Sequence, residues 1–314
     1  MATFDNNRKY GIEIEFSWNG RCPSFDYIAQ KITEAGVPCT ANNRYNASIH
    51  NATPTWKIVP DGSVHNGGEL VSPILSGLEG KEQLRIALRT IKELGAKTDR
   101  SCGIHVHHDA SDMSAKNLAN VAELYKSHEA IIDQFVGESR RRYSGNQYCA
   151  SMHTNRMYWE NASERMYNNT NINSSEQQKS QMIRAISPGR YFHVNFNAYL
   201  RHGTVEFRQH HSSLNVNKIW TWVVFTQTIM SVAKSHRGKI TGRVVNTGPE
   251  ATRGVRGLIR EMGMRKSRNY DDITLDAYKR LMKRLPRELR VNFRNGDAVN
   301  DNRDGIEAVA VATA

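Results

Sequence analysis

The sequence has few cysteines, and their spacing excludes the usual cysteine-based frameworks. Cys22, Cys39, Cys102 and Cys149 are scattered over 314 residues. No two lie at the short spacing of a zinc site, and their density is far below that of a disulfide-rich secreted domain. We therefore expect four free thiols.

The sequence also lacks an apolar run long enough to cross a bilayer. The longest, WTWVVFTQTIMSVA at residues 220–233, is too short and too polar to span one. The opening residues MATFDNN have no basic segment followed by an apolar one, so they do not resemble a secretion signal. We expect no membrane association and a cytoplasmic location, which would be the host cytoplasm for a phage-encoded protein.

Acidic residues are fewer than basic residues, and most of the difference lies near the C-terminus. The chain has 43 Lys and Arg against 31 Asp and Glu, a formal net charge of +12. Between Lys234 and Arg294 there are seventeen basic and six acidic residues, which accounts for almost all of that charge. Such a field favours polyanions, including nucleic acid. However, the aromatic and glycine patterns of nucleic-acid-binding modules are missing, so a solvated basic surface explains it equally well.

Residue periodicity predicts an α+β protein. Helical spacing or caps predict helices at 24–35, from Lys81 to Leu94, after 111–114, at 217–233 and at 274–285. Alternation or turn residues predict strands at 9–18, 56–64, 67–73, 102–109, 190–200 and 203–210. The polar, Asn- and Arg-rich segment 137–181 predicts a long loop or lid. We predict a domain at 1–233 that includes this lid, followed by a basic, mainly helical extension at 234–314.

Two carboxylates lie on one face of the first strand. In KYGIEIEF at 9–16, Ile12, Ile14 and Phe16 point to one side, while Glu13 and Glu15 point to the other. The two carboxylates are about 7 Å apart and repel by roughly 2 kcal/mol at an effective dielectric constant of about 20. A cation between them would remove this penalty.

Three other strands repeat this division into an apolar and a polar face. Since helices would pack on the apolar faces, the polar faces should line a cavity. Glu and His accept Mg²⁺ or Mn²⁺, and Arg forks onto phosphate oxygens, so the set suits a metal nucleotide. Each pattern alone is common in solvent-facing or structural roles, and the hypothesis depends on their occurring together. The polar residues of these strands are His105 and His107, then His193, Asn195 and Asn197, then Glu206 and Arg208.

These motifs, in this order, resemble the amidoligase family of bacteria and bacteriophages, which belongs with the glutamine synthetase-like and glutamate-cysteine ligase-like carboxylate-amine ligases. The resemblance covers about residues 9–233 and rests on YGIEIEF, DGSVHNGGELVSP, CGIHVHH, SRRRYSGNQYC and RYFHVNFNAYLRHGTVEFRQHHSSLN. It implies a curved antiparallel sheet of the glutamine synthetase type, with helices on the outer face. It also implies an ATP-dependent enzyme that joins a carboxylate to an amine through an acyl-phosphate.

The resemblance implies a role for each matching residue. Glu15 and Glu69 would hold one divalent cation, while Glu13, His105 and Glu206 would hold another. His107 would contact phosphate or substrate, and Arg208 would stabilise the transferred phosphoryl group. Arg141, Arg142 and Asn195 would contact the nucleotide or the substrate. The Asn-rich stretch from Asn168 to Ser175 is longer than we expect for a minimal family member, so the substrates stay open.

An ammonium must lose a proton before it attacks, which calls for a base. Asp61, in the turn Asp-Gly-Ser, is the candidate, although an Asp at this position equally well only caps the turn.

Two other functions stay open. One is an inactive relative that binds nucleotide or nucleic acid, and the other is a metal-dependent hydrolase with HVHH as zinc ligands. The basic extension suggests a substrate carried on an anionic polymer, with Arg265, Lys266 and Arg268 as test positions.

Overall fold

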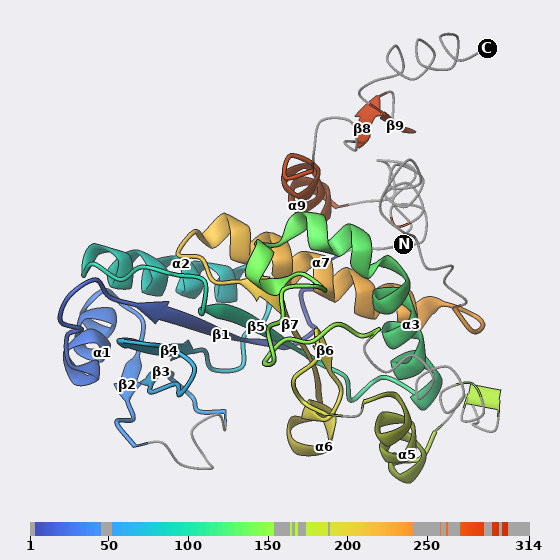
Figure 1. Cartoon of the computed structure of the whole chain (residues 1–314), viewed down its shortest axis with the longest axis horizontal. Coiled ribbons are helices and arrows are strands. Elements are labelled where there is room, and N and C mark those ends of the chain that lie inside the picture. The colour runs from blue at the N-terminus through green and yellow to red at the C-terminus, as the bar shows by residue number, and fades with distance from the viewer. Residues whose placement is uncertain are drawn as a thin grey trace.

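The computed structural model describes residues 4–44, 52–153, 164, 167–168, 174–187, 189–240, 258, 262, 271–285, 291–294 and 297–300. Its centre is a seven-stranded sheet in the order β2-β3-β4-β1-β5-β7-β6 (Figure 1). The strands are β1 (Tyr10–Ser17), β2 (Cys39–Ala41), β3 (Trp56–Val59), β4 (Gly67–Val71), β5 (Gly103–Asp109), β6 (Val194–Asn195) and β7 (Thr204–His211). The pair β8 (Val291–Arg294) and β9 (Asp297–Asn300) forms a separate hairpin.

The sheet confirms the α+β class and corrects one detail of it. All neighbouring strands are antiparallel except β2 and β3, which pair in parallel, so the expectation of a purely antiparallel sheet was wrong at that edge. Helix α1 returns the chain after β1, so β2 runs in the same direction as β1. β3 is separated from β1 by two antiparallel pairings and also has that direction, so β2 and β3 are parallel, with Cys39 opposite Trp56. A short strand that follows a helix closely has little sequence signal of its own.

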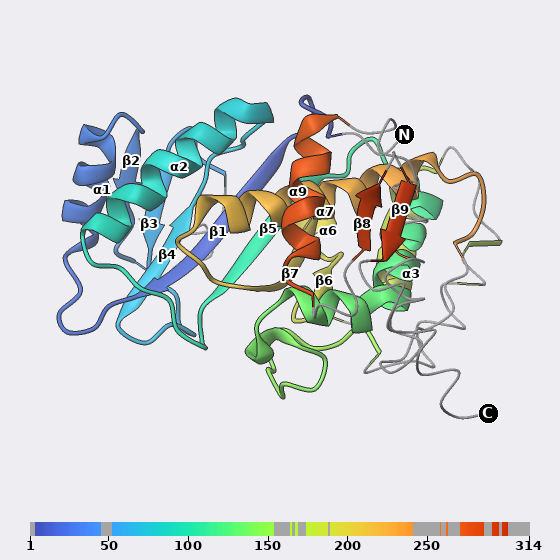
Figure 2. The ribbon, with the colours of Figure 1, turned by 90° about the horizontal axis from the view of Figure 1, so that it is seen from above.

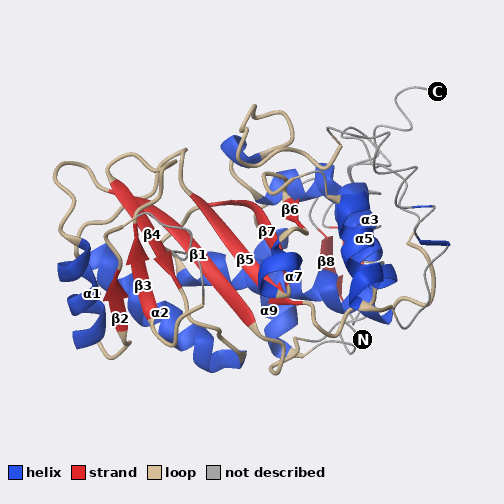
Figure 3. Ribbon diagram, turned by 90° about the horizontal axis from the view of Figure 1, so that it is seen from below, coloured by secondary structure: helices blue, strands red, loops and turns tan. Residues whose placement is uncertain are grey.

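Helices cover one face of the sheet. Figure 2 shows α2 and α7 lying across that face, with α9 packed on α7, and Figure 3 shows the strands from the opposite side. The helices are α1 (Phe25–Glu34), α2 (Gly77–Glu93), α3 (Ala115–Ile132), α5 (Glu176–Ile186), α6 (Ala198–His202), α7 (Val216–Ser235) and α9 (Asp272–Met282), with 3₁₀ turns η1 (Asp133–Phe135) and η2 (Glu138–Arg140).

The apolar residues of the alternating strands form the core beneath these helices. Ile12, Ile14 and Phe16 of β1 are at most 1% exposed, in one apolar cluster with Leu88 of α2 and Trp222 of α7. Burying each such side chain contributes about 1.5–3 kcal/mol. A one-residue register shift would expose them, so the core fixes which face carries the carboxylates.

The predicted helices are present, but one predicted strand is mostly wrong. In the segment 190–200 only Val194–Asn195 is strand, and α6 begins at Ala198. The Asn195 side chain accepts a hydrogen bond from the Asn197 amide at 2.9 Å, which turns the chain away from the ladder. Gly203, at φ +67, ends α6 in a left-handed conformation that suits glycine.

The lid and the extension are described only in part. The described part of 137–181 contains η2 and the start of α5. In the extension, α9 packs against α7, and the Phe4 amide donates to Asp271 at 2.7 Å. Arg265, Lys266 and Arg268 lie outside the described residues, and the division into two domains stays a prediction. Within the described chain, no helix is both long and apolar enough to cross a membrane.

Candidate active site

A cavity of about 550 Å³ lies on the polar face of the sheet. Its walls include side chains from β1, β4, β5 and β7, together with the turn at Asp61 and helix α6. Of the predicted site residues, it is lined by Glu13, Glu15, Asp61, Glu69, His105, His107, Asn195, Glu206 and Arg208.

Strand register brings these side chains together. Glu15 on β1 faces Glu69 on β4, while Glu13 faces His105 on β5. On the other side of β5, His107 faces Glu206 on β7. Directly opposite side chains in an antiparallel pair lie about 5 Å apart at Cβ, so the pairing alone concentrates four carboxylates and two imidazoles.

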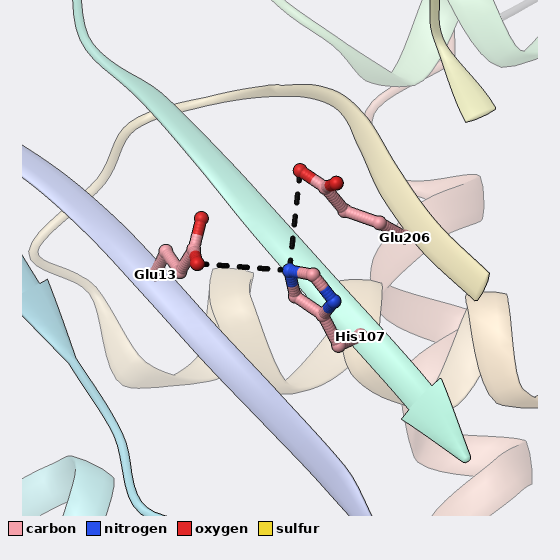
Figure 4. A group of neighbouring side chains, drawn as sticks. All are labelled: Glu13, His107 and Glu206. Carbon is pink, nitrogen blue, oxygen red and sulfur yellow. Dashed lines mark ion pairs between the residues drawn. The ribbon is translucent and has the colours of Figure 1, made fainter. Parts of the chain in front are cut away.

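His107 stands between two carboxylates (Figure 4). Its Nε2 atom lies 3.7 Å from an oxygen of Glu13 and 3.9 Å from one of Glu206. Its Nδ1 atom forms a hydrogen bond with Thr204 Oγ1 at 3.0 Å, which orients the ring. The three donor atoms are arranged as a candidate cation site.

Two further groups of donors lie beside this one, and each shares one carboxylate with a neighbouring group. Glu13, Glu69 and His105 form one, and Glu15, Asp61 and Glu69 form the other, with donor atoms within 4.8 Å of one another in each. The Nε2 atom of His105 is buried and has no hydrogen-bond partner among the described residues. Oxygen-rich groups with at most one imidazole suit Mg²⁺ or Mn²⁺, so these residues fit the expected ions.

The ligand sets that the resemblance implies stay a prediction, and the donor groups can be compared with them. Glu15 groups with Glu69, and Glu13 groups with Glu206, as in those sets. His107 lies in the group with Glu13 and Glu206, and His105 lies in the group with Glu13 and Glu69. Alternation places both histidines on the polar face, and both approach Glu206, His105 Nδ1 at 3.7 Å and His107 Nε2 at 3.9 Å.

The carboxylates differ in electrostatic environment. Burial, followed by the charges of Glu13, Glu15 and Asp61, raises the pKa of Glu69 well above its ordinary value. Burial would also raise the pKa of Glu206, but Arg208 and the two histidines outweigh it and lower this pKa to about 2. Fixed cations therefore favour the charged form of Glu206, whereas burial and acidic neighbours disfavour the charged form of Glu69.

Arg208 and Arg140 are cations that lie beside the carboxylates. Arg208 Nη1 donates to Glu206. The Arg140 guanidinium lies 3.6 Å from Glu15 and packs so closely on Gly103 that a Cβ there would be 2.4 Å from it. A side chain at position 103 would therefore displace the Arg140 guanidinium from this place beside Glu15.

Arg141 and Arg142 are not placed as expected. Neither lines the cavity. Arg142 Nε pairs with Asp133 at 2.8 Å, and Arg141 Nε lies 3.4 Å from the Val136 carbonyl. The arginine that lines the cavity is Arg140, since η2 turns the backbone between these neighbours. Three consecutive arginines carry no periodic signal that separates them.

Sequence reasoning missed Lys57, whose charge is influenced by Glu13 and Glu69, and it also missed several residues that line the cavity. Lys57 on β3 is 4% exposed; burial lowers its pKa, and Glu13 and Glu69 oppose that shift. Its only signal was a charged residue inside an apolar strand. The missed residues that line the cavity include Arg190, Tyr191, Arg201, His202 and Tyr148.

His193 is not brought to the cavity with its neighbours. It is fully buried and pairs with Glu129 of α3, while Asn195 and Asn197 do line the cavity. The Asn195 side chain donates to Glu206 at 2.6 Å. Asp61 accepts a hydrogen bond from the Ser63 amide at 2.7 Å, so it does shape its turn, and it also reaches the group with Glu15 and Glu69.

A family model described as "Putative amidoligase enzyme" matches residues 6–230. The chain belongs to this amidoligase family. All the cavity residues named above lie within the match, whereas the basic extension at 234–314 lies outside it. Membership in the amidoligase family supports a ligase-type enzyme. No curated protein was found to match the sequence.

Proposed function

We propose that this amidoligase-family protein is an ATP-dependent carboxylate-amine ligase that forms an amide or isopeptide bond through an acyl-phosphate. The observation that carries the proposal is the combination, in one cavity, of three overlapping donor groups with four arginines. Paired divalent cations and arginines are what a triphosphate requires. We propose also that the sheet has the curvature of the glutamine synthetase type.

The carboxylates and histidines would hold the divalent cations. Glu13, His107 and Glu206 would form one site, and Glu15, Asp61 and Glu69 another, with His105 between them. The bound ions and ATP would supply phosphoryl transfer to a carboxylate, which is a poor electrophile until it is activated. Glu206 keeps Arg208 directed into the cavity, where its guanidinium can stabilise charge on a transferred group.

Asp61 has two possible contributions to this reaction. As a base it would take a proton from the ammonium, and as a fixed charge it would attract the ammonium and a cation. Its position beside Glu15 and Glu69 supports the second contribution at least as well as the first.

The alternatives fit the geometry less well. A zinc hydrolase would need several histidines of HVHH on one ion, but His108 is fully buried and bonds Thr226 at 2.8 Å, away from the cavity. An inactive nucleotide- or nucleic-acid-binding relative would have no need for complete donor groups. The proposal includes small-molecule substrates. It also includes substrates carried on an anionic polymer that the basic extension attracts.

The test is ADP and phosphate release from Mg²⁺-ATP against pools of amino acids, polyamines and amine-bearing polymers. We expect substrate-stimulated release that is lost in Glu13→Gln and Arg208→Ala, with the amide identified by mass spectrometry. Nucleotide binding without turnover in any pool would favour the inactive relative. Absence of nucleotide binding would overturn the proposal.

A further inference from the structure

A second cavity, of about 470 Å³, adjoins the first on the same face of the sheet. The two cavities share Glu13, His107 and His202 as lining residues. Glu13 and His107 belong to the candidate cation site with Glu206. The second cavity therefore ends at the point where the proposed phosphoryl transfer would occur.

Each strand passes from one cavity into the other at steps of two residues. On β1, Glu15 lines the first cavity, Glu13 lines both, and Gly11 lines the second. On β4 the same step goes from Glu69 to Val71. Since alternate residues share a face, the two cavities are compartments of one trough divided at Glu13 and His107.

The second compartment differs from the first in chemistry. Val71, Pro73 and Ile74 form its apolar side, and Ile74 is 61% exposed. None of the four arginines of the first cavity lines it; among the described residues its charged side chains are Lys9, Glu13 and Asp109. With two carboxylates and one lysine, it favours a cationic ligand that has an apolar portion.

Gly11 gives this compartment its room. A Cβ added at Gly11 would have only His107 Cβ, at 3.8 Å, and Ser72 Oγ, at 3.9 Å, within 4 Å. Those are ordinary contacts, so a side chain fits at the backbone but would extend into the cavity. Residue 11 is thus a position where the second compartment can be filled without a change in the first.

We infer that this compartment is the binding site for the amine substrate of the proposed ligase, and that this amine is primary and carries an alkyl chain. The amino end would lie at Glu13 and His107, where the compartment opens into the first cavity that Asp61 also lines. The chain would lie along Val71, Pro73 and Ile74. The inference rests on the proposed function for its catalytic meaning. The binding site itself can be tested without catalysis.

The experiment measures binding of ethylamine and hexylamine by ligand-observed NMR, without nucleotide, and then amine-stimulated ADP release with Mg²⁺-ATP. At about 0.8 kcal/mol per buried CH₂, four additional methylenes strengthen binding roughly two hundredfold when fully buried, and we expect at least a tenfold gain. Gly11→Leu should remove this preference. Gly62 lines the first cavity and has no atom within 4 Å of an added Cβ. Gly62→Leu should therefore keep the preference for hexylamine and weaken the binding of ATP instead.

Ile74→Asp provides a variant at an exposed position that should fold normally. This substitution should weaken the binding of hexylamine at least fivefold and that of ethylamine less, and the circular dichroism spectrum should be unchanged. Equal binding of the two amines to the wild type, or an unchanged preference in both Gly11→Leu and Ile74→Asp, would overturn the inference. If the preference follows this pattern but no amine stimulates ADP release, the binding site stands and the ligase proposal fails. If amines stimulate ADP release regardless of their chain length and of the residue at position 11, the ligase proposal stands and the proposed binding site fails.

Discussion

Glu15 and Glu69 are directly opposite one another on β1 and β4, and both are nearly inaccessible, at 3% and 1% exposed. Like charges at directly opposite positions of a sheet destabilise it. Arg140, 3.6 Å from Glu15, offsets part of the repulsion. A pair of this kind is tolerated best when a divalent cation joins the two carboxylates.

We expect Mg²⁺ or Mn²⁺ to stabilise the protein through this pair. At a hundred times its dissociation constant, a ligand adds about 2.7 kcal/mol to the free energy of unfolding, which corresponds to a rise in melting temperature of roughly 5 °C for a chain of this size. Glu69→Gln should reduce that rise by at least half in a thermal melt. Glu93→Gln, an exposed control on α2, should retain it. An equal rise in all three proteins would contradict the assignment.

The metal-free protein should lose stability as the pH rises. The pKa of Glu69 is raised by burial and then by its acidic neighbours, so the folded state holds a proton that the unfolded chain releases above pH 4.5. Because the unfolded state then binds fewer protons, the free energy of unfolding falls with rising pH. Urea unfolding in EDTA between pH 5 and 8 should show this slope in the wild type, and Glu69→Gln should flatten it. A slope that persists in the variant would point to other groups.

Arg208 should be required for turnover, whereas Arg142 should not. Arg208→Ala removes the cation next to Glu206 and should reduce kcat about 10²- to 10³-fold, with partial recovery in Arg208→Lys. Arg142→Ala, which removes the partner of Asp133 outside the cavity, should change stability but leave the KM for ATP unchanged. Steady-state ADP release gives both parameters. A raised KM in Arg142→Ala would restore the role implied by the resemblance.

Asp61 can be assigned by comparing two substitutions. Asp61→Asn keeps an oxygen that can accept the hydrogen bond from the Ser63 amide, so it preserves the turn while removing the charge. Asp61→Ala removes both. If the charge matters, both variants should lose at least tenfold in kcat/KM for the amine. If only the turn matters, the Asn variant should resemble the wild type.

The Glu129–His193 pair should stabilise the wall behind Arg208. Glu129 also accepts from the Met152 amide at 2.8 Å and from Ser151 Oγ at 2.6 Å, and the Arg208 amide donates to the His193 carbonyl at 2.8 Å. Removing one partner of a buried pair costs about 3–5 kcal/mol, so Glu129→Gln should reduce the free energy of unfolding by that order. A loss below about 1 kcal/mol would be inconsistent with a buried ion pair.

The same pair predicts a pH dependence. Burial lowers the pKa of His193, but Cys149 and Glu129 outweigh it and raise the pKa to about 10. A raised histidine contributes stability that is complete below the unfolded pKa of about 6.5 and is lost as the pH passes through the folded pKa. The free energy of unfolding should therefore fall between pH 7 and 10, and His193→Gln should weaken that dependence in urea titrations.

The sequence by itself determined which side chains lie on which face of the sheet. Alternation in β1, β5 and β7 decided that Glu13, Glu15, His105, His107 and Glu206 lie opposite the apolar core, since a strand repeats every two residues. Helical spacing and caps likewise located α1, α2, α3, α7 and α9. These features depend on residues near one another in the chain, so local patterns are enough to predict them.

Tertiary structure decided what no local pattern encodes. Strand register placed His107 beside Glu206, and the backbone turn at η2 placed Arg140, rather than Arg141 or Arg142, at the cavity. The Asn195 side chain ended β6 early, and Glu129 from α3 held His193 away from the cavity. Each outcome depends on contacts between residues far apart in the chain or on the competition of a side chain with a strand ladder. Periodicity gives the direction of a side chain but not its partner.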